Sequence, residues 1–151
     1  MELTFVIKSF EQLTPDEVYA ILRLRNEVFV VEQNCVFQDA DNKDQFCFHL
    51  QLYKQKELIA YARLVPAGVT FTEISIGRII TSPEVRGTGM GKILMQHALE
   101  QSYNLFGDEP IRIGAQLYAI GFYESFGFEA AGRIYDEDGI DHIEMVKPNS
   151  K

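Results

Sequence analysis

Apolar residues in the first third of the chain follow a strand pattern and then a helix pattern. Residues 3–8 form a short, largely apolar run that predicts a strand. Thr14, Pro15 and Glu17 then supply an N-cap, a proline in the first turn and a capping-box glutamate, so they predict the start of a helix. Arg25 falls on the expected buried stripe of this helix and therefore needs a partner. The apolar members of that stripe are Val18, Ile21, Leu22, Val28 and Phe29.

Alternation with a period of two marks the next segments as strands. Residues 30–45 are rich in Asn, Asp and Gln, which suits a loop. Residues 46–53 and 58–65 then alternate between the two faces of a strand and predict a hairpin. A long strand is predicted over residues 70–81, and it ends at the Ser-Pro pair that follows.

The C-terminal half returns to helices and ends in a hairpin. Apolar spacing predicts an amphipathic helix over residues 92–103, a strand over residues 111–116 and a second helix over residues 117–126. Gly127 is suited to cap that second helix. Residues 133–146 contain an Asp-Gly turn between alternating runs, which is the usual chemistry of a tight hairpin.

These elements interleave without a strict alternation of strand and helix, so the expected fold class is α/β of the mixed α+β kind, a mixed sheet with helices on its faces. Residues 70–116 follow the plan of a crossover between parallel strands, namely strand, glycine loop, helix and strand. The length of 151 residues fits one domain, and no linker or repeat divides the chain. We therefore expect a single domain over residues 1–151.

Composition and charge narrow the class of partner. With 46% hydrophobic and 24% charged residues the chain is typical of a globular protein. The net charge of −8 and the lack of a Lys/Arg cluster argue against a nucleic-acid partner. No apolar stretch is long enough to cross a bilayer and no leader is recognised, so no membrane association and a cytoplasmic location are expected.

Metal binding is not predicted. Cys35 and Cys47 belong to no zinc-type spacing and are expected to be reduced thiols. The acidic segment 39–44 fails the calcium-loop rule, because Lys43 occupies a ligand position and Asp44 the glycine position. That segment is expected either to line an acceptor site or to be a solvated connection.

The loop from residue 85 to residue 92 places three glycines between a predicted strand and a predicted helix. Glycine lets a ligand approach the backbone, and free N–H groups at a helix start attract phosphate, so the loop suggests pyrophosphate binding. A Walker loop would need glycine at Arg86 and Ser or Thr at Ile93, and a dinucleotide fingerprint would need glycine at Lys92. Both are disfavoured. A glycine-rich turn without a ligand is the structural alternative.

The pattern Arg-Gly-x-Gly-x-Gly after Ser-Pro resembles the coenzyme A loop of the GCN5-related N-acetyltransferase (GNAT) family. A second block supports the resemblance, since Gly114-Ala115-Gln116, Phe122-Tyr123-Glu124 and Gly127-Phe128 are similar to that family's downstream helix. Further segments look like the bacterial ElaA subgroup, namely LRLRNEVFVVEQNC, IGRII and YDEDGIDHIEM. The resemblance implies a central mixed, mostly antiparallel sheet with helices on both faces. It also implies transfer of an acetyl group from acetyl-CoA to a primary amine by direct attack in a ternary complex.

The resemblance also implies which residues bind the coenzyme. In the family, main-chain groups of the strand before the loop pair with the pantetheine arm, a role that falls here on Ile79, Ile80 and Thr81. Gln116 resembles a position whose side-chain amide reaches the coenzyme. The implied phosphate-binding residues are Arg86, Gly87, Thr88, Gly89, Met90, Gly91 and Lys92. Acetyl-CoA is then a cosubstrate, and no metal is expected.

Catalytic residues are implied less completely. Tyr123 matches the family tyrosine that protonates the departing thiolate, and a phenol with an ordinary pKa near 10 can do so at neutral pH. Many relatives carry a glutamate on the strand before the loop, but the matching face here offers Ser75 and Gly77. Candidates for the general base are Glu32, His142 and Glu73, while His49 and His97 are expected to be structural or surface residues.

The sequence does not determine the identity of the amine acceptor or the oligomeric state. The expected acceptor is a small-molecule or peptide amine, and a homodimer is left open. The missing strand glutamate keeps one alternative function, a non-catalytic acyl-CoA-binding sensor or interaction module.

Overall fold

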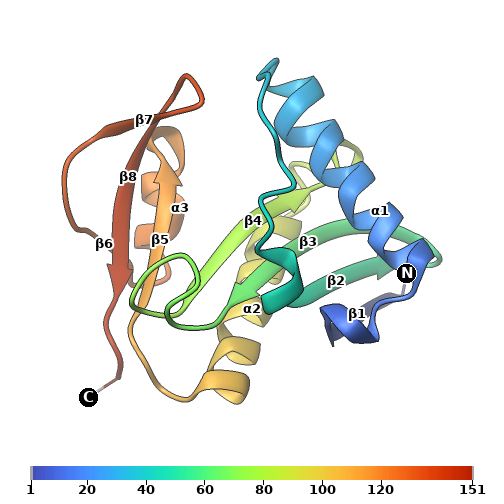
Figure 1. Cartoon of the computed structure of the whole chain (residues 1–151), viewed down its shortest axis with the longest axis horizontal. Helices are drawn as coiled ribbons and strands as arrows, with labels where there is room; N and C mark the ends of the chain where they lie inside the picture. The colour runs from blue at the N-terminus through green and yellow to red at the C-terminus, as the bar shows by residue number, and fades with distance from the viewer. Residues whose placement is uncertain (1, 151) are drawn as a thin grey trace.

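A computed structural model describes residues 2–150 of the chain (Figure 1). The longer elements run in the order β1 (Leu3–Ser9), α1 (Pro15–Arg25), the π-helix η2 (Asn26–Glu32), β2 (Phe48–Lys54), β3 (Glu57–Val65), β4 (Ser75–Thr81), α2 (Met90–Phe106), β5 (Ile111–Gln116), α3 (Ile120–Glu124), β6 (Glu129–Ala130), β7 (Tyr135–Glu137) and β8 (Ile140–Lys147). Short 3₁₀ turns join them at η1 (Phe10–Gln12), η3 (Asp44–Phe46), η4 (Pro83–Val85) and η5 (Leu117–Ala119).

The strands form two sheets that meet at one end and part at the other. Strands β1, β2, β3 and β4 make an antiparallel sheet in that order, and β5, β8 and β6 make a second one, in which β7 also pairs with β8. A parallel bridge, Ile74 to Ile111, links the two sheets, and Arg112 N donates to Ile74 O at 3.0 Å. Beyond this bridge β4 and β5 separate, as Figure 1 shows.

Helices α1 and α2 cover opposite faces of the first sheet, with α1 in front of the strands and α2 behind them in Figure 1. Ile21 and Leu24 of α1 are buried against Tyr61 of β3. On the other face, Leu94 and Met95 of α2 are buried in the main core. This arrangement confirms the predicted fold class, a mixed, mostly antiparallel sheet structure with helices on both faces.

Local signals in the sequence predicted the element ends well. Thr14 Oγ1 accepts from Glu17 N at 3.1 Å, and Glu17 Oε1 accepts from Thr14 N at 2.9 Å, so the capping box forms as expected. Asp138 and Gly139, with φ of 53° and 83°, make the turn between β7 and β8. Gly127, with φ of 94°, has the left-handed backbone of a C-terminal cap, but α3 ends at Glu124 with Ser125 as its C-cap and is shorter than the predicted helix over residues 117–126.

Three expectations were wrong in detail. Strand β4 begins at Ser75, because residues 70–74 form bends and the bridge at Ile74 rather than a ladder. Leu22 is exposed, and Leu24 takes its place in the core. The first helix does not end as an α-helix but continues as the π-helix η2, a form that is rare and is frequent at functional sites.

Strand β4 carries a β-bulge at its centre. Tyr61 pairs with Ile80 and Arg63 pairs with Gly77, so two residues of β4, Arg78 and Ile79, stand opposite the single residue between them on β3. A bulge leaves one residue out of the ladder and re-aims the backbone locally. The bulge lies where β4 faces the gap between the sheets.

Within residues 2–150, no helix is long and apolar enough to span a lipid bilayer.

Candidate functional site

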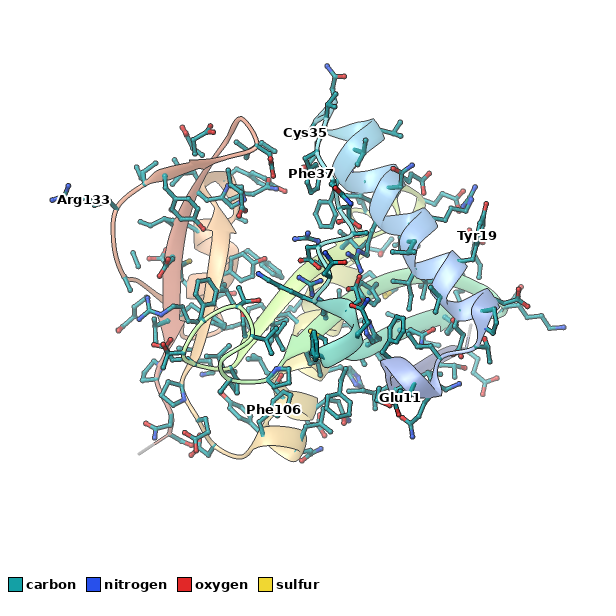
Figure 2. The ribbon with its side chains drawn as sticks, in the orientation of Figure 1. Glu11, Tyr19, Cys35, Phe37, Phe106 and Arg133 are labelled. Carbon is teal, nitrogen blue, oxygen red and sulfur yellow. The ribbon has the colours of Figure 1, made fainter. Side chains whose placement is uncertain are left out.

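A cleft of about 930 Å³ opens between the two sheets, where β4 and β5 part. Its walls come from three stretches of the chain, residues 28–43, residues 63–86 and residues 113–142. The first stretch includes Cys35 and Phe37, which Figure 2 shows on the segment between α1 and β2, on the side toward the β7–β8 hairpin. The residues predicted from the sequence that line this cleft are Glu32, Ile79, Ile80, Thr81, Arg86, Gln116, Tyr123 and His142.

Strand β4, the edge strand of its sheet, forms one wall of the cleft. Ile79, Ile80 and Thr81 all line it, and Ile79 belongs to the bulge. Because a bulge residue is not fully paired in the ladder, its N–H is available to a ligand. A backbone N–H placed beside a thioester can stabilise negative charge on the carbonyl oxygen. The partly opened strand therefore suits an extended arm that pairs with main chain.

The glycine loop, residues 85–92, contains Arg86 and leads into α2. Gly87 and Gly89 have φ of 79° and 83°, in the left-handed region that favours glycine. No atom lies within 4 Å of the place where a side chain's first carbon would stand at either position. Gly89 is the N-cap of α2, so the unpaired N–H groups of the first turn point out of the helix beside this open space. These features fit a phosphate site, although residues 87–92 are not part of the cleft lining.

Arg86 and Glu32 form a bidentate ion pair across the cleft's edge. Arg86 Nη2 donates to Glu32 Oε1 at 2.6 Å, and Nη1 donates to Oε2. The hydrogen bond from Arg86 lowers the pKa of Glu32 below its ordinary value. Glu32 is therefore a weak candidate for a general base, since its carboxylate is held in the charged form.

Tyr123 presents its phenol to the cleft from α3. Its ring packs edge-on against Phe122 and Phe128, with centroid distances of 5.3 and 6.0 Å. Burial, together with the neighbouring Tyr118, raises the pKa of Tyr123 to about 12. Within residues 2–150 the phenol makes no side-chain hydrogen bond, so it is free to donate to a ligand atom. A protonated, cleft-facing phenol suits a general acid.

His142 is buried in the cleft wall and has a fixed tautomer. Its Nδ1 lies 2.8 Å from Ile140 O, and because a carbonyl oxygen only accepts, Nδ1 carries the hydrogen. The other nitrogen, Nε2, lies 3.4 Å from Glu137 Oε2. An imidazole held in this way leaves Nε2 to take up a proton, and the Glu137 carboxylate then stabilises the imidazolium.

The remaining predicted positions divide between the cleft and the outside. Gln116 ends β5, pairs in register with His142 and lines the cleft. Glu73 does not line it, and its carboxylate is bound by Arg112, with Nη2 to Oε2 at 3.0 Å. His49 is buried and structural as expected, with Nε2 donating to Asp44 O at 2.9 Å.

Sequence reasoning missed a closed ring of three arginines and three aspartates beside the cleft. The arginines come from α1, β3 and β4, and the aspartates all come from the acidic segment between η2 and β2. Each member contacts the next at N–O distances from 2.7 to 3.4 Å, in the order Arg25, Asp39, Arg78, Asp41, Arg63, Asp44 and back to Arg25. We call these six residues the charge ring.

The charge ring is largely buried and electrically balanced. Arg25 and Arg63 are 0% and 3% exposed, so each needs carboxylate partners to offset the cost of burial. Burial raises the pKa of Asp41 and of Asp44, but the hydrogen bonds and charges of Arg63 and Arg25 outweigh it and hold both values below the ordinary one. The sequence signal was present, because Arg63 and Arg78 interrupt apolar strand runs, but the pattern did not show which acid each arginine meets.

Within the described part of the chain, no group of three or more His, Cys, Asp or Glu side chains is arranged to hold a metal ion.

Comparisons with known proteins agree with this geometry. A family model described as "Acetyltransferase (GNAT) domain" matches residues 11–148. The chain is 41% identical over 138 residues to "Protein ElaA" of Escherichia coli K12, covering 90% of each protein. A crystal structure of an acyl-CoA N-acyltransferase from Pseudomonas aeruginosa superposes with a TM-score of 0.92 at 38% identity, covering 97% of this chain and 99% of that one. The crystal structure of E. coli ElaA gives a TM-score of 0.90 at 38% identity with the same coverage.

Proposed function

Because the chain belongs to the GNAT acetyltransferase family, we propose that it is an N-acetyltransferase that moves an acetyl group from acetyl-CoA to a primary amine. The amine attacks the thioester carbon directly while both substrates are bound. The amide bond forms as the carbon–sulfur bond breaks, one proton leaves the amine and one proton reaches the coenzyme sulfur. No covalent intermediate with the protein is needed.

The observation that carries this proposal is the cleft at the parting of β4 and β5, with the glycine loop at the end of β4. Strand β4 is the edge strand of its sheet and meets β5 at Ile74, so beyond that point its outer edge at Ile79 and Ile80 can pair with an extended arm. The open space beside Gly87 and Gly89, at the start of α2, suits a diphosphate. The residues present therefore fit a coenzyme A thioester, which would place its acyl group beside the bulge.

Proton transfer is assigned to Tyr123 and His142. Tyr123 donates a proton to the leaving sulfur, which its raised pKa allows at every physiological pH. His142 Nε2 accepts the proton of the attacking amine, directly or through one water, and Glu137 stabilises the charge that forms. Glu32 and Glu73 are not favoured as bases because each is already bound to an arginine.

The acceptor is proposed to be a primary amine of a small molecule or a peptide. The cleft lining includes Phe37 and Glu137, so it offers both apolar and acidic surface to an incoming ammonium group.

The test is acceptor-dependent release of free thiol from acetyl-CoA and from longer acyl-CoA donors. The acceptor panel should contain polyamines, amino acids, aminoglycosides and peptides with a free N-terminus or a lysine, with product mass as a second readout. We expect at least one amine to raise thiol release well above hydrolysis and to gain the acyl group. Tight coenzyme binding without transfer to any amine would instead support the non-catalytic acyl-CoA sensor.

A further inference from the structure

Arg78 occupies an unusual backbone position at the centre of the cleft wall. Its φ is 47°, in the left-handed region that non-glycine residues rarely adopt, and it is one of the two bulge residues of β4. A glycine stands directly before it at position 77, yet Gly77 is not the left-handed residue. A side chain at a strained position persists only when its surroundings fix it there.

The surroundings of Arg78 do fix it. Its Nε donates to Asp39 Oδ1 at 2.8 Å, and its Nη2 donates to Asp39 O at 3.0 Å and to Asp41 Oδ2 at 3.4 Å. The guanidinium also lies 5.8 Å from the Phe29 ring centroid and 5.9 Å from that of Phe37. The side chain therefore links the bulge to the acidic segment and to the π-helix at once.

The charge ring extends this link to the protein core. Asp39 is shared between Arg78 and Arg25, and Asp41 is shared between Arg78 and Arg63. Both of those arginines are almost fully buried, so the carboxylates that hold Arg78 are themselves held by immobile partners. Arg78 is the most exposed arginine of the ring, with a side chain that is 23% exposed, and it lines the cleft.

We propose that Arg78 is a positioning residue: anchored by the charge ring, it holds the β4 bulge so that the backbone N–H groups around Ile79 face the thioester oxygen of the bound acyl donor. This inference rests on the proposed function for its catalytic consequence. Arg78 itself is assigned no proton transfer, and its Nε and Nη2 donate to Asp39 and Asp41. Its role is to keep the oxyanion donors in place, where misplacement by about 1 Å can cost about 100-fold in rate.

Two variants separate the side chain from the backbone. Arg78→Gly removes the side chain at a position whose φ favours glycine. This variant therefore relieves backbone strain while it loses the contacts of the side chain with Asp39 and Asp41. Arg78→Ala removes the same anchor and keeps a strained β-carbon. Arg112→Ala is the matched control, because Arg112 is 25% exposed, also meets two carboxylates, Glu73 and Glu144, and lies outside the cleft lining.

We expect Arg78→Gly and Arg78→Ala to lower kcat by about 10- to 100-fold, while the Kd for coenzyme A measured by calorimetry stays within about threefold. Arg112→Ala should leave kcat and Kd unchanged. Asp39→Asn should lower kcat in the same way. In the Arg78→Ala background it should lower kcat little further, because both substitutions break the same Arg78–Asp39 contact. Amide exchange measured by NMR should become faster from Ile76 to Thr81 and stay unchanged in β1 and β2.

Three results would overturn the proposal. The first is wild-type kcat in Arg78→Gly, and the second is a loss of coenzyme affinity that equals the loss of turnover, which would make Arg78 a binding residue. The third is wild-type amide exchange across β4 in both Arg78 variants. If the wild-type protein acetylates no amine at all, the proposed function fails alone, and the exchange data still decide whether Arg78 holds the bulge.

Discussion

Glu32 of the π-helix and Arg86 of the glycine loop face each other across the mouth of the cleft and bind through both oxygens and both terminal nitrogens. The pair joins two segments that are 54 residues apart in the sequence. Arg86 was predicted to meet a phosphate, and Glu32 was one candidate base. The Arg86 guanidinium is already bound by the Glu32 carboxylate. A phosphate that binds Arg86 must therefore share the guanidinium with this carboxylate or displace it.

Removal of Glu32 should strengthen coenzyme binding. In Glu32→Ala the guanidinium of Arg86 is free for phosphate, so we expect the Kd for coenzyme A to fall by about two- to fivefold, the size of an exposed ion pair. Arg86→Ala should raise that Kd. Glu11→Ala, in η1, is the control, because it changes the net charge equally while Glu11 is not among the charges that act on Arg86. A weaker Kd in Glu32→Ala would assign Glu32 itself to the coenzyme site.

Loss of the Tyr123 hydroxyl should slow the reaction without weakening binding. General acid catalysis contributes about 100-fold or more, so Tyr123→Phe should lower kcat by about that factor with little change in KM for acetyl-CoA. Because the pKa of Tyr123 is raised to about 12, wild-type turnover should show no loss from phenol ionisation up to about pH 10. Tyr103→Phe, on α2 and outside the cleft lining, is the control. An unchanged kcat in Tyr123→Phe would remove the acid assignment.

The base assignment depends on the Nε2 atom of His142. His142→Gln cannot accept the amine proton, and we expect kcat to fall by about 100-fold at neutral pH. Glu137→Gln should lower kcat by a smaller factor, because it removes only the stabilising charge. The kcat of Glu32→Gln should stay within about threefold of the wild-type value. Should Glu32→Gln lose more activity than His142→Gln, the two roles would have to be exchanged.

The charge ring predicts a specific acid sensitivity. Folded Asp41 and Asp44 have lowered pKa values, so the unfolded chain takes up their protons first as pH falls. Their stabilising contribution is therefore fully present above the ordinary carboxyl pKa of about 4 and is lost as pH drops below it toward the folded values. Urea unfolding at a series of pH values should show this decline.

Asp44→Asn supplies the matching variant. It should cost on the order of 3 kcal/mol at neutral pH, because two buried arginines lose a partner. It should also reduce the loss of unfolding free energy as pH falls below about 4. Glu144→Gln, which breaks an exposed pair with Arg112, should cost less than about 1 kcal/mol. Equal slopes below pH 4 in wild type and Asp44→Asn would show that the ring does not carry the pH dependence.

Features governed by neighbouring residues were predictable from the sequence. Thr14 and Glu17 form a capping box because the interaction spans one helical turn. Asp138 and Gly139 adopt left-handed backbone because the tight hairpin requires it. The glycines lie between β4 and α2 as the sequence predicted, and Tyr123, to which the family resemblance pointed, lines the cleft.

Features set by tertiary packing were not predictable in this way. Arg25 was known to need a partner, but the choice of Asp39 and Asp44 depends on how the acidic segment folds across the sheet. The bulge at Arg78 could not be predicted from the sequence. The neighbouring glycine, Gly77, is not the residue with the left-handed backbone, which is Arg78 itself. The meeting of Glu32 with Arg86 likewise required the π-helix and the loop to be placed in space.

The most direct measurement is a crystal structure of the protein with acetyl-CoA. We predict that the diphosphate lies against the N–H groups between Gly87 and Lys92, the pantetheine arm runs along Ile79 to Thr81, and the sulfur lies within hydrogen-bond reach of Tyr123 Oη. A coenzyme bound outside the β4–β5 cleft, or crystals that show none at saturating concentration, would contradict the account.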